Sequence, residues 1–220
     1  MRIDGIELTL QFPLPKADAA MALAGASIRV AESGIHAVTG PSGCGKSSLL
    51  YVLAGLRPPT AGTVYYDNVD IQSLCADALA HTRRSKFGVI FQQHFLLDAL
   101  SVLDNVLVPL NSADKRSRQE AQDLLALLGL EGLGQRMPYE LSHGQRQRVA
   151  VARALVNNPE VIFADEPTAA LDRESTLTVM DVLAERRQRS AILLITHDPQ
   201  LLERADTVFR MKDGRILAHP

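Results

Sequence analysis

The 220-residue chain contains no tryptophan, only two cysteines and just 5% aromatic residues. Cys44 and Cys75 are too few for a disulfide framework and too far apart for a metal-binding knuckle, so the chain fits a reducing compartment. Lys and Arg number 23 against 25 Asp and Glu, and this lack of a basic excess argues against a nucleic-acid partner. No run reaches the ~18 apolar residues that span a bilayer, and residues 1–7 lack the basic and apolar run of a signal peptide. We therefore expect a cytoplasmic chain with no direct membrane insertion.

Short apolar runs alternate with longer helical stretches, which predicts an α/β fold with a mostly parallel sheet and flanking helices. Residues 35–39, 161–164 and 192–196 each form a short apolar run bounded by Gly, Pro or polar residues, as buried parallel strands do. Open α/β sheets bind ligands at the carboxyl ends of their strands. The polar residues that follow these runs are therefore the candidate functional site.

Two further patterns predict smaller parts within one domain that spans residues 1–220. Residues 63–66 and 207–211 precede the turns Asp67-Asn68 and Asp213-Gly214, which is typical of antiparallel hairpins, and residues 6–12 alternate in the same way. Between about 101 and 156 the apolar residues recur at helical spacing. We expect an antiparallel β subdomain and an α-helical subdomain at approximately residues 93–158.

The run GPSGCGKS at residues 40–47 follows the first apolar strand and satisfies the phosphate-loop pattern. Its glycines leave backbone N–H groups open to a phosphate chain, and the helix that follows adds positive potential. Lys46 is expected to reach the β- and γ-phosphates, and the Ser47 hydroxyl to bind Mg²⁺. An ordinary Gly-rich turn is the alternative, but a chance match is on the order of 1% in a chain of this length. The predicted nucleotide-binding residues here are Gly40, Pro41, Ser42, Gly43, Cys44, Gly45, Lys46, Ser47 and Ser48.

Two acids and a histidine follow the other two buried runs. Asp165 and Glu166 end the strand at 161–164, and His197 follows the strand at 192–196. Because consecutive strand residues face opposite ways, Asp165 is expected at the metal and Glu166 beside the γ-phosphate, where it orients or deprotonates the attacking water. His197 is expected to contact the γ-phosphate or that water. A surface strand exit with two acids is the alternative, and the nearby phosphate loop makes it the weaker one.

The stretch LSHGQRQRVA at residues 141–150 resembles the LSGGQ signature of ABC-type ATPases, and it precedes the strand that ends in Asp165. Other motifs follow in the order of that family: Gln92 resembles the Q-loop glutamine, residues 169–172 the D-loop, and His197 the switch histidine. The resemblance covers essentially the whole chain. It implies an ABC-type ATPase core of the P-loop class.

The resemblance also implies cofactors and partners. ATP and Mg²⁺ are the expected cofactors, with Gln92 near the γ-phosphate and the metal. Two copies are expected to pair head to tail, so that Ser142, Gly144 and Gln145 of one close over ATP held by Lys46 of the other. The alternative is that these three residues only form the N-terminus of a capped helix, with Ser142 as the N-cap.

Two positions depart from the pattern of the family. His143 stands at the first glycine of the signature and adds bulk and a titratable group where the facing nucleotide is expected. The family usually has an aromatic residue near the N-terminus that stacks on adenine, and Phe12 is the candidate, with a place in the core or on an edge strand as its alternative.

The resemblance is greatest to the branch of lipoprotein-releasing and macrolide-exporting ATPases. It implies an ATP-hydrolysing subunit that powers a separately encoded membrane permease and lies at the inner face of the membrane through it. The apolar residues of segment 94–100 would then be partly exposed as the docking surface. A cell-division-type ATPase, which regulates a membrane partner mechanically without transport, is the alternative. A soluble ATPase acting on nucleic acid or ribosomes is disfavoured, because the chain has neither a duplicated cassette nor a long coiled coil.

Overall fold

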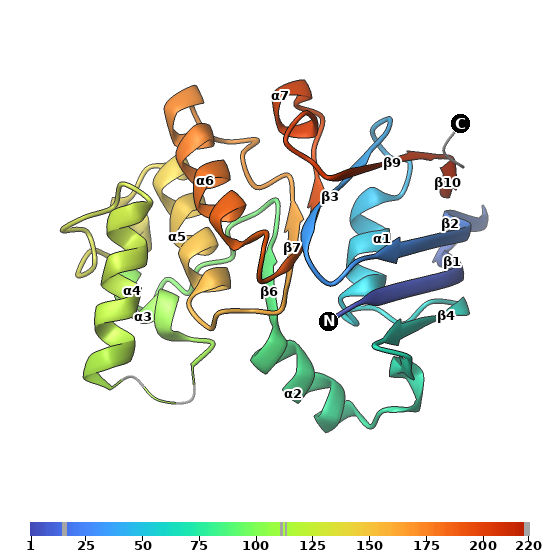
Figure 1. The fold of residues 1–220 in the computed structure, drawn as a ribbon, viewed down its shortest axis with the longest axis horizontal. Helices are drawn as coiled ribbons and strands as arrows, with labels where there is room; N and C mark the ends of the chain where they lie inside the picture. The colour runs from blue at the N-terminus through green and yellow to red at the C-terminus, as the bar shows by residue number, and fades with distance from the viewer. Residues whose placement is uncertain (15–16, 111, 113, 218–220) are drawn as a thin grey trace.

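A six-stranded, mostly parallel sheet forms the centre of the protein (Figure 1). The structure is a computed structural model that describes residues 1–14, 17–110, 112 and 114–217. Five neighbouring strands, β9, β3, β8, β7 and β6 in that order, run parallel, and β10 pairs antiparallel with β9 at one edge. Their bounds are β3 (Gly34–Thr39), β6 (Phe87–Ile90), β7 (Val161–Asp165), β8 (Ala191–Ile195), β9 (Thr207–Lys212) and β10 (Arg215–Leu217).

A second, antiparallel sheet lies to the right of the first in Figure 1, with helix α1 (Lys46–Leu53) beside it. The turn between its last two strands has positive φ at Asp67 and Asn68, as a two-residue hairpin requires. Helix α1 contacts strands of both sheets. The strands are β1 (Ile3–Leu14), β2 (Ala17–Val30), β4 (Ala61–Tyr66) and β5 (Val69–Asp70), in the order β2-β1-β4-β5.

Helices cover the other side of the central sheet, at the left of Figure 1. Helix α5 (His143–Leu155) packs against α3, α4, α6 and strand β6, which joins the helical part to the sheet. The other helices are α2 (Ala76–Lys86), α3 (Val102–Leu107), α4 (Lys115–Leu127), α6 (Arg173–Arg186) and α7 (Pro199–Leu202), with short 3₁₀ turns at Ile71–Ser73 and Pro138–Glu140.

The central sheet separates two hydrophobic cores. Ile162 and Ala164 of β7 belong to the core shared with α3 to α6, whereas Phe163 belongs to the core shared with α1 and the antiparallel sheet. Alternate side chains of a strand point to opposite faces, so a strand covered on both sides must be apolar throughout. All five residues of β7 and all five of β8 are buried.

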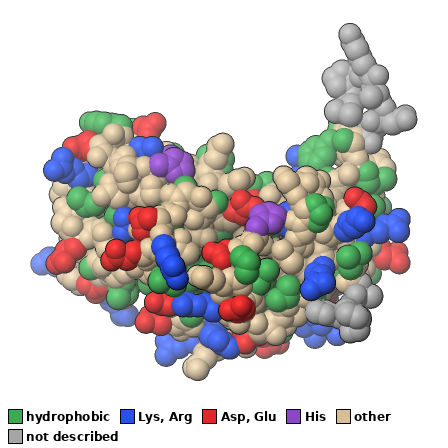
Figure 2. All heavy atoms as spheres, turned by 90° about the horizontal axis from the view of Figure 1, so that it is seen from above, with side chains coloured by type: hydrophobic (Ala, Val, Ile, Leu, Met, Phe, Trp, Pro, Cys, Tyr) green, Lys and Arg blue, Asp and Glu red, His purple; other side chains and the backbone are tan. Residues whose placement is uncertain are grey.

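The predicted α/β fold with an antiparallel sheet and a helical part is confirmed. The predicted strands at 35–39, 161–164 and 192–196 are β3, β7 and β8, and both predicted hairpins are present. The helix expected after the phosphate loop is α1, which begins at Lys46. On the face shown in Figure 2, acidic and basic side chains are interspersed. None of the helices in the described part of the chain combines the length and the apolar character that crossing a bilayer needs.

Candidate nucleotide-binding site

The loop at residues 40–47 connects β3 to α1 and curls around the amine of Lys46. The Lys46 Nζ donates to the backbone oxygens of Gly40 and Pro41, at 2.9 Å each, and lies 3.9 Å from the Cys44 sulfur. Lys46 as a whole is 7% exposed. The loop therefore holds one buried positive charge at the start of a helix. This combination of a cation with the N–H groups of a helix N-terminus attracts a phosphate.

Two glycines of this loop touch neighbouring backbone. A Cβ atom at Gly40 would lie 2.0 Å from the Met211 oxygen, and one at Gly45 would lie 2.1 Å from the Ala22 oxygen. Gly45 also has φ of 103°, a left-handed conformation that costs other residues free energy. Strands β2 and β9 therefore leave no space for side chains at these two positions.

Asp165 is the last residue of β7, and its carboxylate faces α1. It is 2% exposed, lies beside the Ser47 side chain, and is 3.5 Å from the Tyr51 hydroxyl. Burial raises the pKa of Asp165, and the nearby Glu166 adds to the rise, because both disfavour a further negative charge. Ser47 and Asp165 thus place two hard oxygen donors together, the ligand type that Mg²⁺ prefers.

Glu166 lies just beyond the strand, between two other predicted site residues. Its Oε1 is 3.0 Å from His197 Nε2, and its Oε2 accepts from Gln92 Nε2 at 3.4 Å. The backbone of Glu166 has φ of 47°, a conformation that non-glycine residues adopt rarely. This turn of the chain, rather than strand alternation alone, sends the two neighbouring acids in different directions.

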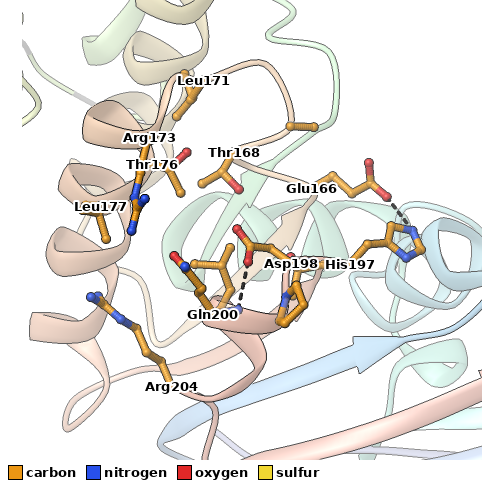
Figure 3. Close-up of a pocket in the computed structure, with 14 residues that line it drawn as sticks. Glu166, Thr168, Leu171, Arg173, Thr176, Leu177, His197, Asp198, Gln200 and Arg204 are labelled. Carbon is orange, nitrogen blue, oxygen red and sulfur yellow. Dashed lines mark hydrogen bonds and ion pairs between the residues drawn. The ribbon is translucent and has the colours of Figure 1, made fainter.

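A cavity of about 620 Å³ opens beside this group (Figure 3). Glu166 and His197 lie at one side of it, and Thr168 and Leu171 of the segment after β7 form another part of its wall. Helix α6 adds the side chains of Arg173 and Thr176, helix α7 adds Gln200, and Arg204 lies just after α7. The acid and the imidazole are therefore accessible from a hollow surface.

Ser142 begins α5 as its N-cap. Its hydroxyl accepts from the Gln145 backbone N–H at 3.2 Å, while the Gln145 side chain accepts from the Ser142 backbone N–H at 2.8 Å. This reciprocal pair is a capping box, which confirms the N-cap predicted for Ser142. Gly144 lies beside residues 170 and 171, since a Cβ there would meet Leu171 at 3.4 Å. Among the described residues, no hydrogen bond joins Ser142, Gly144 or Gln145 to the loop at 40–47.

His143 contacts the segment that follows Gln92. Its ring centroid lies 5.5 Å from that of His94, and His94 Nε2 accepts from Arg146 Nε at 3.1 Å. Burial lowers the pKa of His94, and the neighbouring Arg146 lowers it further. The segment is also held by α5, because Arg153 donates to the His94 oxygen at 2.8 Å. Sequence reasoning missed these contacts, which depend on how α5 packs against β6.

Phe12 lies in β1, partly buried against the core of the antiparallel sheet. The guanidinium of Arg57 lies 4.3 Å from the centre of its ring, a cation–π contact. Phe12 is thus placed on the same side of the molecule as α1, and one of its faces is covered by Arg57.

The predicted partial exposure of segment 94–100 is confirmed. Phe95 is 57% exposed and Leu97 is 50% exposed, whereas Leu96 packs against the core. Phe95 and Leu97 line a groove of about 350 Å³ together with Val108, Pro109 and Arg153. An apolar groove of this kind is a surface to which another protein can bind.

A known protein family matches most of the chain. The family described as ABC transporter matches residues 23–169, which include the loop at 40–47, Gln92, the signature and Asp165-Glu166. The chain belongs to the ABC transporter family. It is an ATP-binding domain of that family, as the motifs predicted, and the two acids and His197 stand at the edge of its central sheet.

The relatives of this ABC domain include macrolide exporters, which confirms the predicted branch. It is 44% identical over 202 residues to the macrolide export ATP-binding/permease protein MacB of Shigella flexneri, covering 90% of this chain and 31% of that protein. It is 45% identical over 186 residues to MacB of Bartonella henselae, covering 83% and 28%. The chain therefore spans about a third of the length of these curated relatives.

Solved structures of an ATP-binding cassette share the fold of this ABC domain. The cassette MJ0796, in a dimeric post-hydrolysis state bound to ADP and Pi, superimposes with a TM-score of 0.92 at 32% identity, covering 98% of this chain and 97% of that one. Another dimeric structure of MJ0796 gives the same TM-score at 33% identity, with the same coverage.

Proposed function

We propose that this ABC domain binds and hydrolyses Mg-ATP and powers a membrane permease. The observation that carries the proposal is the placement of Glu166, which lies between Gln92 and His197 at the sheet edge that also holds the phosphate loop. A carboxylate that accepts a hydrogen bond from Gln92 on one side and lies against the His197 imidazole on the other has a restricted orientation, as a general base or water-positioning group needs. Relatives that are cassettes of transporters support the same reading.

Each residue of the site has a role in this proposal. Lys46 and the backbone N–H groups of the phosphate loop, to which Pro41 contributes none, bind the phosphates. Glu166 activates the attacking water, and His197 holds Glu166 and the γ-phosphate. Ser47 and Asp165 would hold Mg²⁺, and Gln92 would lie close enough to contact it. The metal supplies positive charge that stabilises the transition state of phosphoryl transfer.

Two copies of the chain are needed to complete this site. Ser142, Gly144 and Gln145 begin a helix and are not hydrogen-bonded to the phosphate loop of their own chain. In a head-to-tail dimer, this helix N-terminus would meet the nucleotide held by the partner. The solved MJ0796 cassettes are dimers, which supports the pairing. Phe12 is proposed to stack on adenine, with Arg57 on its other face.

The apolar groove at Phe95 and Leu97 is the proposed docking surface for the permease. A chain docked there would lie peripherally at the inner face of the membrane. The helices within residues 93–158 would then move as one subdomain, because α5 holds the docking segment through hydrogen bonds to Phe91, His94 and Phe95. Macrolide exporters among the relatives favour transport over purely mechanical regulation of a membrane partner.

The variant Glu166→Gln tests the proposal. We expect it to bind ATP, to hydrolyse it at least 100-fold more slowly than the wild type, and to accumulate a dimer in Mg-ATP, as measured by phosphate release and size-exclusion chromatography. The matched control is Glu174→Gln, an exposed acid in the first turn of α6, which should retain normal turnover. Rapid hydrolysis by Glu166→Gln would overturn the role of the base.

The same trapped variant tests the membrane partner. Tagged Glu166→Gln, purified from solubilised membranes with Mg-ATP, should retain a polytopic protein, and the double variant with Phe95→Asp should not. Recovery of soluble chains alone, with a known permease complex recovered in parallel, would refute the coupling to a membrane and leave the ATPase in place.

A further inference from the structure

Tyr51 lies on the same face of α1 as Ser47, one helical turn further on. Residues four apart on a helix are neighbours on its surface, and both hydroxyls here face Asp165. The Ser47 side chain lies beside the carboxylate, and the Tyr51 hydroxyl donates to its Oδ2 over 3.5 Å. Two residues of one helix therefore flank the proposed metal ligand.

Tyr51 is connected to the protein surface by two more aromatic rings. Its ring centroid lies 5.9 Å from that of Phe91, with the planes tilted by 58°, and Phe91 lies 5.4 Å from Phe95, edge to face at 88°. Aromatic pairs at such distances and angles attract one another beyond the area that they bury. The three rings run from the metal ligand to the exposed groove.

Phe95, the outermost ring, is held in an unusual backbone conformation. Its φ is 42°, and Arg153 of α5 donates to the carbonyl oxygens of His94 and Phe95 at 2.8 and 2.6 Å. A non-glycine residue keeps a positive φ only where its surroundings fix it. The ring is thus held between Phe91 and the groove, although more than half of the residue is exposed to solvent.

We propose that Tyr51 is a positioning residue for Asp165, and that the rings of Phe91 and Phe95 set the place of Tyr51. A partner in the groove that shifts or fixes Phe95 would thereby change how well Asp165 binds the metal. This role presupposes the proposed function, in which the chain binds Mg-ATP. It adds a direct physical connection between the groove and the metal ligand. Glu166 and the γ-phosphate contacts do not take part in it.

The test measures metal binding rather than turnover. Mn²⁺ serves as the probe, and its free concentration is followed by electron paramagnetic resonance in the presence of saturating ATP. We expect Tyr51→Phe to weaken the apparent Mn²⁺ affinity by about threefold to tenfold, the range for one lost hydrogen bond. Tyr139→Phe, which changes an exposed tyrosine in the 3₁₀ turn before α5, should leave the affinity unchanged.

Variants in the groove test the connection between the rings. Phe95→Ala removes a ring that touches neither metal nor nucleotide, and it should weaken Mn²⁺ binding by about twofold to threefold. Leu97→Ala is the matched control, because Leu97 lines the same groove and is also half exposed but lies outside the row of rings. The double variant Tyr51→Phe/Phe95→Ala should bind Mn²⁺ with nearly the same affinity as Tyr51→Phe alone. The two changes act through one contact, so their effects should not add.

The outcomes separate this proposal from the one on which it rests. If the wild type binds no Mn²⁺ with ATP, the proposed function fails and the positioning role fails with it. If the wild type binds Mn²⁺ and Tyr51→Phe binds it equally well, only the positioning role is refuted. If Phe95→Ala equals the wild type, or Leu97→Ala weakens binding as much as Phe95→Ala does, the connection through the rings is refuted. Thermal melts of each variant without nucleotide should remain close to those of the wild type.

Discussion

Asp165 is a carboxylate that the fold buries at a cost. Burial raises its pKa, so the folded chain binds a proton at this site more tightly than the unfolded chain does. The free energy of unfolding therefore falls as the pH rises from the unfolded to the folded pKa, and above both values the whole penalty remains. A cation beside the carboxylate would offset this penalty, which explains why so costly a group stands at the site.

The first prediction is that Asp165→Asn stabilises the nucleotide-free protein. At pH 7 the amide carries no charge to desolvate, so the melting temperature should rise, and its difference from the wild type should shrink as the pH is lowered. Asp181→Asn is the control, because Asp181 is exposed and paired with Arg204. A lower melting temperature for Asp165→Asn at pH 7, measured by calorimetry, would contradict the prediction.

The second prediction concerns Cys44, whose sulfur lies in the phosphate loop 3.9 Å from Lys46 Nζ. In a Cys75→Ser background, modification by N-ethylmaleimide should abolish ATP binding, because Cys44 is buried against the core and an adduct there would displace the phosphate loop. Bound Mg-ATP should protect the thiol, and Cys44→Ala should still bind ATP. Fluorescent-nucleotide binding measures all three, and full binding after complete modification of Cys44 would disprove the prediction.

Part of the site's arrangement could be predicted from the sequence. The acids after β7 and His197 follow buried strands whose ends meet at one sheet edge, and the structure brings Gln92, Glu166 and His197 together there; their roles stay predictions. Tyr51 was not identified, because its contacts come from how α1 packs against β7 and the segment after β6. No spacing within the sequence reports such a contact.

At the scale of elements, α5 combines two tasks at its first turn. Ser142 caps the helix and is also proposed to meet the nucleotide of the partner chain. The third prediction separates these tasks: Ser142→Ala and Ser101→Ala should each destabilise the protein by about 1 kcal/mol, since each residue caps a helix. Urea unfolding measures this loss.

The dimer then distinguishes the two caps. In a Glu166→Gln background with Mg-ATP, Ser142→Ala should weaken the dimer, and Ser101→Ala should leave it intact, as measured by sedimentation. Equal dimerisation of the two variants would show that Ser142 acts only within its own helix.

The elements themselves were predicted unevenly. Strands β3, β7 and β8 were found because they are buried on both faces and are therefore continuous apolar runs. The long strand β2 was missed, because it is rich in alanine and pairs with β1 through several register shifts, which breaks the alternation of apolar and polar residues. The extent of the helical subdomain, residues 93–158, stays a prediction.

At the scale of the whole molecule, the candidate nucleotide site lies at the edge of the central sheet, whose strand β7 contributes side chains to both cores. The fourth prediction is that ATP at 100 times its Kd raises the free energy of unfolding by about 2.7 kcal/mol. Lys46→Ala should lose this gain, because the phosphates lose their cation. Chemical unfolding with and without ATP tests it, and an undiminished gain in Lys46→Ala would contradict the role of the lysine.

Gly40 and Gly45 press against the backbone of β9 and β2, so these positions exclude larger residues even when no nucleotide is bound. The glycines of the motif would then persist in a descendant that had lost its catalytic glutamate, because folding alone preserves them. Among degenerate copies of this domain, glycines kept at positions 40 and 45 would be evidence of a folded protein, and residues such as Lys46, Asp165 and Glu166 would distinguish a working enzyme from a pseudoenzyme.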